Sequence, residues 1–353
     1  MSIATTKRKR GGGAAAKKVE WAVKVKVVGV GGGGGNAISR MYHDFPRGVE
    51  FIAINTDAQD LEMAAARRRI HIGQTVTGGM GAGMNPELGA RAAEEDRTEI
   101  AETLKGADLV FLTAGLGGGT GTGAMPVVAE VARELGALTI AVVTKPFAFE
   151  GTQRARIAQE GIIKLRDKVD ALIVIPNDRI FSIIEKDTPI IKAFAEIDEV
   201  LKRAVQGIVD LITSAGIINV DFADIKAVMA GAGSAIVGVG IASGAERCTD
   251  AVRQALNSPL LEVTPDGAKG VLFGVSGGRD LKMTEINEAA KIITEAVDPG
   301  AKIIFGAYHD RRLKQGQVKV MLIATGFTDS RPALGTLFGG ESRGTGGGMF
   351  KRM

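Results

Sequence analysis

Two glycine-rich runs, each directly after a short apolar stretch, constrain the fold of this 353-residue chain more than any other feature. The runs span residues 30–36 and 115–123, and the apolar stretches before them span residues 25–30 and 109–113. A strand, a glycine run and a helix in this order leave backbone N–H groups at the helix start free to bind an anion. Because glycine lets the backbone approach a phosphate closely, the two runs predict a phosphate site and not two flexible linkers.

The first run alone also fits a different class of protein. Gly29, Gly31 and Gly34 match the Gly-x-Gly-x-x-Gly fingerprint of dinucleotide-binding enzymes, and Asp57 lies far enough downstream to bind a ribose hydroxyl. A Rossmann-type, dinucleotide-dependent oxidoreductase is therefore a remote alternative. The sequence contains no Gly-x-x-x-x-Gly-Lys-Ser/Thr motif, and this excludes an ordinary P-loop nucleotidase.

The first half of the chain alternates short apolar runs with helix-like segments. This rhythm predicts an α/β fold, with a parallel sheet covered by helices on both faces and a nucleotide at the carboxyl ends of its strands. The predicted strands are residues 25–30, 51–54, 109–113, 139–143 and 171–175, and the predicted helices include 86–104 and 126–135.

A long amphipathic segment, residues 190–213, separates this half from a second α/β unit. It contains no proline and its apolar residues recur at helical spacing, so it predicts one long helix. The last two strands of the second unit are candidates for an antiparallel hairpin across residues 306–316. The second unit has predicted strands at 235–241, 270–275, 302–305 and 317–324, and predicted helices at 246–256 and 284–296.

The net charge of +4 is unevenly distributed along the chain. Residues 1–18 carry +6 without any acid and residues 329–353 carry +2, which leaves −4 on the remainder. We expect residues 1–22 and 329–353 to be disordered tails, the first strongly basic. These tails either contact an anionic membrane or neighbouring acidic subunits, or are simply solvated. We expect no specific nucleic-acid partner.

Composition also limits the cellular compartment in which the protein can reside and the metal sites that it can form. A single cysteine, Cys248, excludes an internal disulfide, and three scattered histidines give no structural zinc site. No apolar run reaches the eighteen or so residues that a membrane span needs, and no signal-peptide pattern opens the sequence. We therefore expect a cytoplasmic protein.

One segment carries a specific family resemblance. Residues 113–124 read Thr-Ala-Gly-Leu-Gly-Gly-Gly-Thr-Gly-Thr-Gly-Ala, which resembles the signature of the tubulin/FtsZ superfamily. Further segments resemble its bacterial-type cell-division branch, the FtsZ family, in the same order from about residue 23 to residue 327. These segments are residues 55–57, 81–86, 144–147 with 149–151, 175–178 and 219–224.

The resemblance implies a tubulin-like α/β fold in three parts. A GTP-binding domain would span residues 23–189, a central helix residues 190–214, and a smaller C-terminal α/β domain residues 215–328. It also implies a nucleotide site in which the glycine runs bind the α- and β-phosphates and a third loop senses the γ-phosphate. Read alone, that third loop is only the turn before a helix at Pro86, with Asn85 as its cap. The implied phosphate-binding residues are Gly32, Gly33, Gly34, Gly35, Asn36, Ala82, Gly83, Met84, Asn85, Gly117, Gly118, Gly119, Thr120, Gly121, Thr122 and Gly123.

The residues expected to bind the ribose and the base lie elsewhere in the sequence. Glu150 and Arg154 read alone as a surface ion pair one helical turn apart, but the resemblance places them on the ribose and the nucleotide, with Asn177 on the ribose or base. Phe194 and Asp198 are four apart and share a helix face, so the ring can stack on a purine while the carboxylate accepts N1–H and N2–H of guanine. Adenine has no N1–H to donate, so guanine is the predicted base. Without the glycine runs, Asp198 would read as a solvated helix position.

Two carboxylates are predicted to act on the nucleotide of another subunit. Asp221 and Asp224 lie three apart at a predicted helix start, where negative charge also favours simple capping. A helix over residues 190–213 is about 36 Å long, so one chain cannot bring Asp198 and Asp224 to the same nucleotide. Head-to-tail stacking can, and such contacts generate open filaments. The resemblance implies that Asn219, Asp221 and Asp224 complete the neighbour's site and polarise the attacking water.

These observations together predict a filament-forming GTPase of the cell-division ring, at the division site in the cytoplasm. Its ligands would be GTP or GDP with Mg²⁺ on the phosphates, and K⁺ as a further candidate ion. The alternative is a tubulin-like structural filament protein with little GTPase activity. Its main partner would be itself. Anchoring and regulatory proteins would need a docking peptide, of which residues 349–352 are at best a remnant.

Overall fold

The computed structural model describes residues 23–46, 48–213, 216–258, 267–310 and 312–327, so both predicted tails lie outside the described residues. Within them, one sheet of eleven strands runs through the molecule in the order β3-β2-β1-β4-β5-β6-β8-β11-β9-β10-β7. The strands from β3 to β6 all pair in parallel, which confirms the predicted parallel sheet. The strands are β1 (Val25–Val30), β2 (Val49–Asn55), β3 (Arg68–His71), β4 (Leu109–Gly115), β5 (Leu138–Lys145), β6 (Ala171–Pro176), β7 (Gly216–Ile218), β8 (Gly233–Ser243), β9 (Gly270–Gly277), β10 (Lys302–His309) and β11 (Gln317–Thr325).

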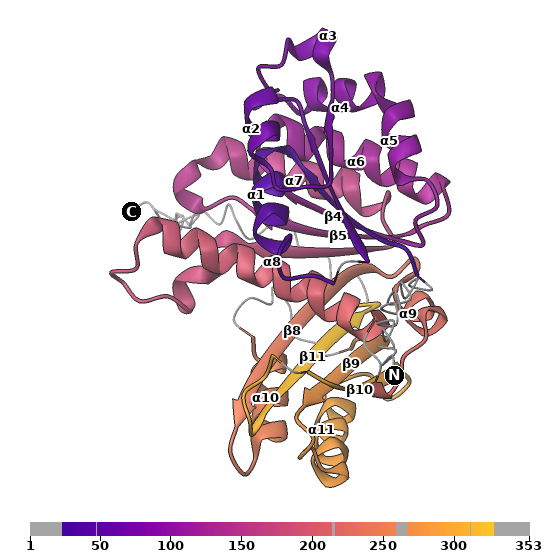
Figure 1. Ribbon diagram of the computed structural model, residues 1–353. Coiled ribbons are helices and arrows are strands. Elements are labelled where there is room, and N and C mark those ends of the chain that lie inside the picture. Colours follow the sequence, from indigo (N-terminus) through magenta and orange to yellow (C-terminus); the bar gives the residue numbers. More distant parts are fainter. Residues whose placement is uncertain (1–22, 47, 214–215, 259–266, 311, 328–353) are drawn as a thin grey trace, which may run out of the picture.

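Helices cover both faces of the parallel part of the sheet (Figure 1). Helices α1 and α8 share one apolar cluster with alternate residues of β1, β4 and β5, and α4 to α7 share a second cluster on the opposite face. A third cluster joins α10 and α11 to the C-terminal strands. The helices are α1 (Gly31–Met41), α2 (Ala58–Met63), α3 (Gln74–Thr77), α4 (Pro86–Glu95), α5 (Arg97–Leu104), α6 (Gly119–Glu134), η1 (Ala148–Glu150), α7 (Thr152–Arg166), η2 (Asn177–Ser182), α8 (Ile190–Thr213), α9 (Phe222–Met229), α10 (Arg247–Leu256) and α11 (Met283–Glu295).

The helix predicted over residues 86–104 is in fact two helices. Asp96 interrupts it with φ −108° and ψ 23°, ending α4 and beginning α5. Its carboxylate accepts the Gly73 amide at 2.6 Å. This contact reaches 23 residues back along the chain, so helical periodicity alone could not reveal the break.

The predicted hairpin between the last two strands is wrong. β11 lies between β8 and β9 and runs antiparallel to both, while β10 pairs in parallel with β9 and antiparallel with β7. Most of β11 is buried, including every residue from Val320 to Thr325. A strand that is apolar on both faces is stable only where both faces are buried, and the centre of the sheet provides such a position.

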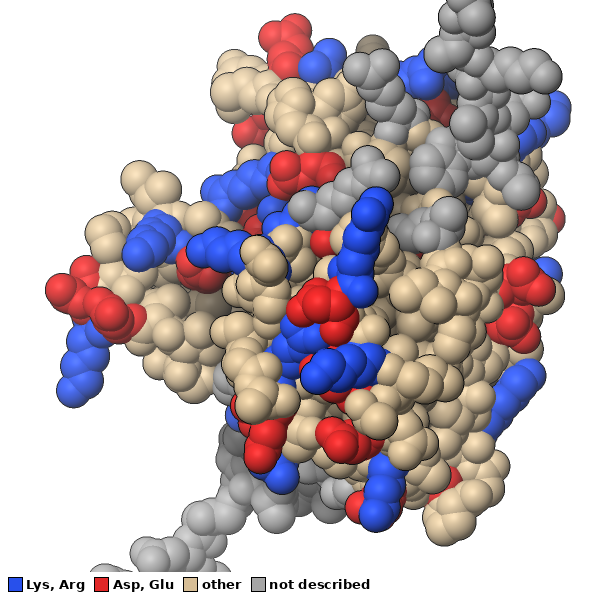
Figure 2. Space-filling model, turned by 60° about the horizontal axis from the view of Figure 1, so that its bottom comes forward, with Lys and Arg blue, Asp and Glu red and all other residues tan. Residues whose placement is uncertain are grey.

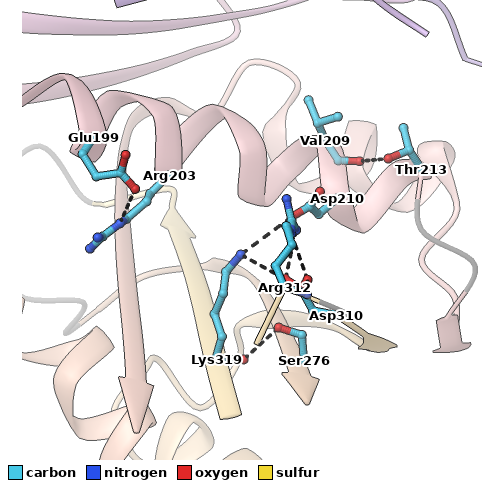
Figure 3. Close-up of polar contacts among 9 residues, drawn as sticks. All are labelled: Glu199, Arg203, Val209, Asp210, Thr213, Ser276, Asp310, Arg312 and Lys319. Atoms are coloured by element: carbon cyan, nitrogen blue, oxygen red, sulfur yellow. Dashed lines mark hydrogen bonds and ion pairs between the residues drawn. The ribbon is translucent and has the colours of Figure 1, made fainter. Parts of the chain in front are cut away.

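Helix α8 crosses between the two parts of the molecule and is fastened to the C-terminal part by a charged cluster (Figure 3). Asp210 of α8 accepts from Arg312 at 2.5 Å and lies 3.7 Å from the Lys319 ammonium on β11. Asp310 pairs with the same arginine at 2.8 Å. Burial raises the pKa of Asp210 and lowers that of Lys319, and the opposite charges counteract both shifts. The cluster therefore fixes α8 relative to β11.

An Asp210→Ala variant is expected to unfold at a markedly lower denaturant concentration than the wild type. Removing the shared carboxylate leaves the Lys319 ammonium, whose side chain is 12% exposed, opposite Asp310 at 4.0 Å. Breaking a buried pair in this way costs about 3 kcal/mol. Arg203→Ala on the same helix is the matched control, since it removes only the exposed pair with Glu199, which is worth less than about 1 kcal/mol. Equal midpoints for the two variants would contradict the role of the cluster.

On the face drawn in Figure 2, basic and acidic side chains are interspersed among uncharged ones, without a patch of one sign. No described helix has the length and apolar character that crossing a membrane requires.

Candidate functional site

The glycines of the first run and the second half of the second run form the first turns of two helices, while Leu116, Gly117 and Gly118 form the turn before α6. α1 begins at Gly31 and includes the remaining glycines and Asn36, and α6 begins at Gly119, seven residues before the predicted start at Pro126. Glycine and proline both have low helix propensity, which is why the predicted start of α6 was too late. The correction strengthens the expected chemistry, because the amides of a first helical turn have no partner within the helix.

The starts of α1 and α6 lie against each other. A Cβ built on Gly31 would lie 2.9 Å from the amide nitrogen of Gly121, and one built on Gly33 would lie 3.1 Å from that of Gly115. Gly31 also has a φ of +71°, which favours glycine. The two helix N-termini therefore converge at the carboxyl ends of β1 and β4, where their dipoles act on one position.

The third predicted phosphate loop, residues 82–85, joins the same region. The Gly119 amide donates to the Gly83 carbonyl oxygen at 2.6 Å, which connects the loop to the start of α6. Asn85 caps α4, accepting from the amides of Glu87 and Leu88 at 3.0 and 3.1 Å. The capping expectation is confirmed, while Gly83 and Met84 remain exposed beside the glycine helices.

Several glycines of the second run are also required by packing between α4 and α6. A Cβ on Gly123 would overlap the Pro86 carbonyl oxygen, and one on Gly119 would lie 2.6 Å from the Ala82 oxygen. From the sequence, these glycines were expected only to let the backbone approach a phosphate. Their periodicity of four within α6 was the available signal for a close helix contact.

The two threonine hydroxyls of the second run have partners within the protein. Thr120 Oγ1 lies 2.6 Å from Thr56 Oγ1, and Thr122 Oγ1 accepts the Gly117 amide at 2.9 Å. In the sequence, Thr56 stands out only as part of the family-like segment of residues 55–57. The structure thus gives both hydroxyls a role in holding the loop, beyond the expected donation to a ligand.

Asn177 has a buried side-chain oxygen without a hydrogen-bond partner among the described residues. It follows β6 directly and is 8% exposed, and its Oδ1 has no hydrogen-bond partner among the described residues. A buried polar atom without a partner is costly and is usually satisfied by water or a ligand. The expectation that Asn177 reaches a ribose or base agrees with this.

Glu150 and Arg154 form the ion pair that their spacing predicts. Arg154 donates to Glu150 Oε2 at 2.6 Å, and Glu150 Oε1 accepts the Phe147 amide at 2.9 Å. A Cβ on Gly117 would lie 3.1 Å from the Arg154 carbonyl oxygen, so the pair borders the second glycine run. Its expected contacts with a nucleotide remain predictions.

Phe194 and Asp198 share one face near the start of α8, as predicted. The Phe194 ring is 39% exposed and meets Phe147 edge to face, with ring centroids 5.5 Å apart. The Asp198 carboxylate forms an ion pair with Arg40 at the end of α1. Sequence reasoning missed Arg40, because its partner lies 158 residues away along the chain.

An apolar cavity of about 400 Å³ lies against Phe194. It is bounded by aromatic side chains from the segments after β5 and β6 and by the start of α8. Such a volume suits part of a planar organic ligand. The lining includes Phe147, Phe149, Phe181, Ile184, Ile190 and Phe194.

The predicted catalytic residues lie at the opposite end of α8. Asn219, Asp221 and Asp224 are exposed around β7 and the start of α9, beyond the C-terminal end of this 24-residue helix. Asp221 occupies the N-cap position of α9, but its side chain makes no capping hydrogen bond. Capping alone therefore does not account for Asp221.

The side chain of Asp57 caps a helix. The dinucleotide interpretation would instead place this residue on a ribose. Its Oδ1 accepts the amides of Gln59 and Asp60 at 2.9 and 3.2 Å and so caps α2. Asp57 therefore has a structural role that does not require a ribose.

Comparison with known proteins agrees with this arrangement. The GTPase domain of the tubulin/FtsZ family matches residues 24–185, and the C-terminal domain of the FtsZ family matches residues 233–328. FtsZ from M. jannaschii, solved as an empty dimer, is 47% identical, with 87% of this chain and 89% of that chain covered and a TM-score of 0.82. Two proteins from Haloferax volcanii share the fold. They are CetZ2 as a GTPγS-bound protofilament (23% identity, 88% and 95% covered, TM-score 0.75) and CetZ1 as a GDP-bound monomer (24%, 87% and 95%, TM-score 0.75).

The two family models lie in the two halves of the chain, and the first of them includes the converging glycine helices. The expected tubulin-like fold is thereby confirmed. The chain belongs to the FtsZ family, within the tubulin/FtsZ superfamily of GTP-binding cytoskeletal GTPases.

Proposed function

We propose that this chain binds GTP at the starts of α1 and α6, assembles head to tail, and hydrolyses GTP only where the α9 end of a second copy covers the nucleotide. The observation that carries the proposal is the separation of the two half-sites by α8. Arg40 of α1 pairs with Asp198 in the first half of this 24-residue helix, which is about 36 Å long, and Asp221 and Asp224 lie beyond its C-terminal end. A single chain therefore holds two incomplete halves.

The exposed face of α1 suggests how the nucleotide lies. Gly33, Asn36 and Arg40 are exposed, are spaced three and four apart, and so share one face. From Gly33 to Arg40 this face rises about 10 Å, and it ends at the ion pair with Asp198. Phosphates at the helix start and a guanine near Asp198 would occupy its two ends. Phe194 would then stack on the base and Asn177 would satisfy its buried Oδ1 on the ribose or base.

The chemistry is mainly positioning and charge neutralisation. The free amides of α1 and α6 would neutralise the α- and β-phosphates, and residues 82–85 would contact the γ-phosphate. The carboxylates of Asp221 and Asp224 from the next copy would orient and polarise the attacking water, with Asn219 shaping their loop through its 2.7 Å contact to the Gly216 amide.

A magnesium ion would be held chiefly by the GTP phosphates. The described residues contain no group of three or more His, Cys, Asp or Glu side chains that could hold a metal ion. Mg²⁺ commonly binds through substrate phosphates, water and only one or two protein carboxylates, so this donor set fits it. When bound, the ion neutralises phosphate charge. K⁺ is a second candidate ion for the same junction.

Within a cell, such filaments would form the division ring, with a GTP-binding domain over residues 23–189 and a C-terminal domain over 215–328 joined by α8. The competing proposal is a structural filament that turns GTP over poorly. Phosphate release and light scattering, measured with GTP and GDP over a protein concentration series, separate the two. We expect GTP-dependent scattering and a phosphate release rate per subunit that rises above a threshold concentration. Scattering without phosphate release would support the structural filament.

Asp198 is expected to set the preference for guanine. Asp198→Ala leaves the N1–H and N2–H donors unpaired, which costs roughly 1–3 kcal/mol of GTP affinity. Asp198→Asn retains one acceptor and presents an amide donor, so it should lose less GTP affinity and gain relative affinity for xanthosine triphosphate, whose base carries a carbonyl at position 2. Competition binding with the two nucleotides measures this. An Asn variant without any relative gain would place Asp198 away from the base edge.

A further inference from the structure

Arg40 lies at the end of α1, between the face of this helix that is proposed to bind the phosphates and Asp198, the carboxylate that is proposed to bind the base. It lies on the same helix face as Gly33 and Asn36, and its guanidinium pairs with Asp198 Oδ2. The Arg40 side chain is 43% exposed and the Asp198 side chain 14% exposed. A cation with access to solvent therefore contacts a nearly enclosed carboxylate.

The protonation state of Asp198 decides what it can recognise. Burial raises the pKa of Asp198 to about 6, and the charge and hydrogen bond of Arg40 act against that increase. An ionised carboxylate only accepts hydrogen bonds, whereas a protonated one carries an O–H donor. Since guanine presents two donors, N1–H and N2–H, the ionised form is the one that pairs with it.

Other charged groups around α8 have different partners. Lys202, one turn beyond Asp198, pairs with Asp44 at 2.9 Å and with Glu199 at 2.5 Å. Glu199 also pairs with Arg203. The interface between α1 and α8 therefore contains two separate ion-pair groups, and that of Lys202 does not include Asp198.

The remaining elements packed against α8 contribute few charges. From η2, Asp178 accepts the Ala148 amide, and Arg179 is the other charged residue. β5 carries a single charged residue, Lys145, at its end, and β8 contains none. Among the described residues, Arg40 is the cation that pairs with Asp198.

We propose that Arg40 is a positioning residue for base recognition, which holds the Asp198 carboxylate ionised and turns its remaining acceptor sites toward the N1–H and N2–H edge of guanine. Each carboxylate oxygen has two acceptor sites, so Oδ2 can accept from Arg40 and still face the base. This inference rests on the proposed assignment of Asp198 to guanine. It adds that the affinity for guanine depends on pH, because the ionisation of Asp198 on α8 depends on its pairing with Arg40 on α1.

The test compares Arg40→Met and Arg40→Lys with the wild type in titrations with GDP and inosine diphosphate, from about pH 5 to about pH 9. Inosine diphosphate lacks the 2-amino group, and diphosphates avoid assembly. The wild type should bind GDP with constant affinity above about pH 7 and lose about tenfold per pH unit well below pH 6. Arg40→Met should move this midpoint upward by about 1–3 pH units, the range in which a neighbouring opposite charge shifts a carboxyl. Arg40→Lys should restore most of the wild-type profile.

The preference for GDP over inosine diphosphate provides a second readout. It should shrink in Arg40→Met at neutral pH and return at high pH, where Asp198 ionises without help. Lys202→Met is the matched control, since it removes a cation from the same helix interface and should leave the midpoint unchanged. A structural role for Arg40 would instead lower GDP and inosine diphosphate affinity equally at every pH.

Two results would overturn the inference. One is an Arg40→Met profile with the wild-type midpoint, and the other is tighter GDP binding by Arg40→Met at high pH, which would make Arg40 a competitor of the base. Asp198→Ala separates this failure from failure of the proposed function. If Asp198→Ala keeps the full preference for GDP, the base assignment itself is wrong. If it loses that preference while Arg40→Met changes nothing, only the role of Arg40 fails.

Discussion

An Asp224→Ala variant is expected to bind GTP and assemble like the wild type while hydrolysing GTP at least about 100-fold more slowly. Loss of a positioned general base or water-orienting carboxylate typically reduces a rate by about 10²–10⁴-fold. Asp224 lies in the exposed first turn of α9, beyond the far end of α8 from the glycine helices of its own chain. Its removal should therefore leave GTP affinity within the same chain intact. Nucleotide titration, scattering and phosphate release measure the three properties.

The control for this variant is Asp250→Ala. Asp250 occupies the first turn of α10, so the substitution removes an acidic residue from the first turn of another C-terminal helix. It should leave hydrolysis unchanged. If monomeric Asp224→Ala lost GTP affinity as strongly as a glycine variant, the carboxylate would act within its own chain and the proposal of a shared site would be wrong.

A Gly121→Ala variant is expected to lose at least about 100-fold in GTP affinity, and with it GTP-dependent assembly. The added Cβ would lie 2.7 Å from the Gly115 carbonyl oxygen, so the start of α6 must move away from the end of β4. Hydrogen bonds to charged groups are worth about 1.5–3 kcal/mol each, so misplacing two phosphate-binding amides gives a loss of this size. Titration of the monomer with GDP measures it.

The comparison for Gly121→Ala is Gly277→Ala at the end of β9. There the added Cβ would lie 3.5 Å from Leu281, an ordinary contact, and far along the sequence from the glycine helices. It should bind GDP like the wild type. Wild-type affinity in a folded Gly121→Ala protein would contradict the placement of the phosphates at the start of α6.

Most of the fold could be predicted because it is encoded by local patterns. The strands before each glycine run and the long helix α8 were found from apolar periodicity, and their ends moved by only a few residues. Where the prediction failed, distant contacts decided the structure. Asp96 breaks a helix by bonding to Gly73, and β11 takes a central place in the sheet because two other strands cover it.

The candidate site shows the same division. The glycine runs, Asn177 and the Phe194 and Asp198 face could be identified from the sequence, because each carries a local motif or spacing. Arg40 could not, since only the packing of α1 on α8 brings it to Asp198. The four-residue spacing of Gly119 and Gly123 signals a close helix contact, but it does not identify Pro86 as the partner of Gly123.

The central claim is that one copy of the chain completes the active site of the next. The most direct measurement mixes Asp224→Ala, which binds GTP but lacks the carboxylate, with Gly121→Ala, which keeps the carboxylate but binds GTP poorly, and follows phosphate release. Each variant alone should be nearly inactive. The mixture should recover activity that peaks near equal amounts, because a Gly121→Ala subunit can cover the GTP held by an Asp224→Ala subunit. A mixture no more active than the sum of its separate components, with co-assembly verified by sedimentation, would contradict the shared site.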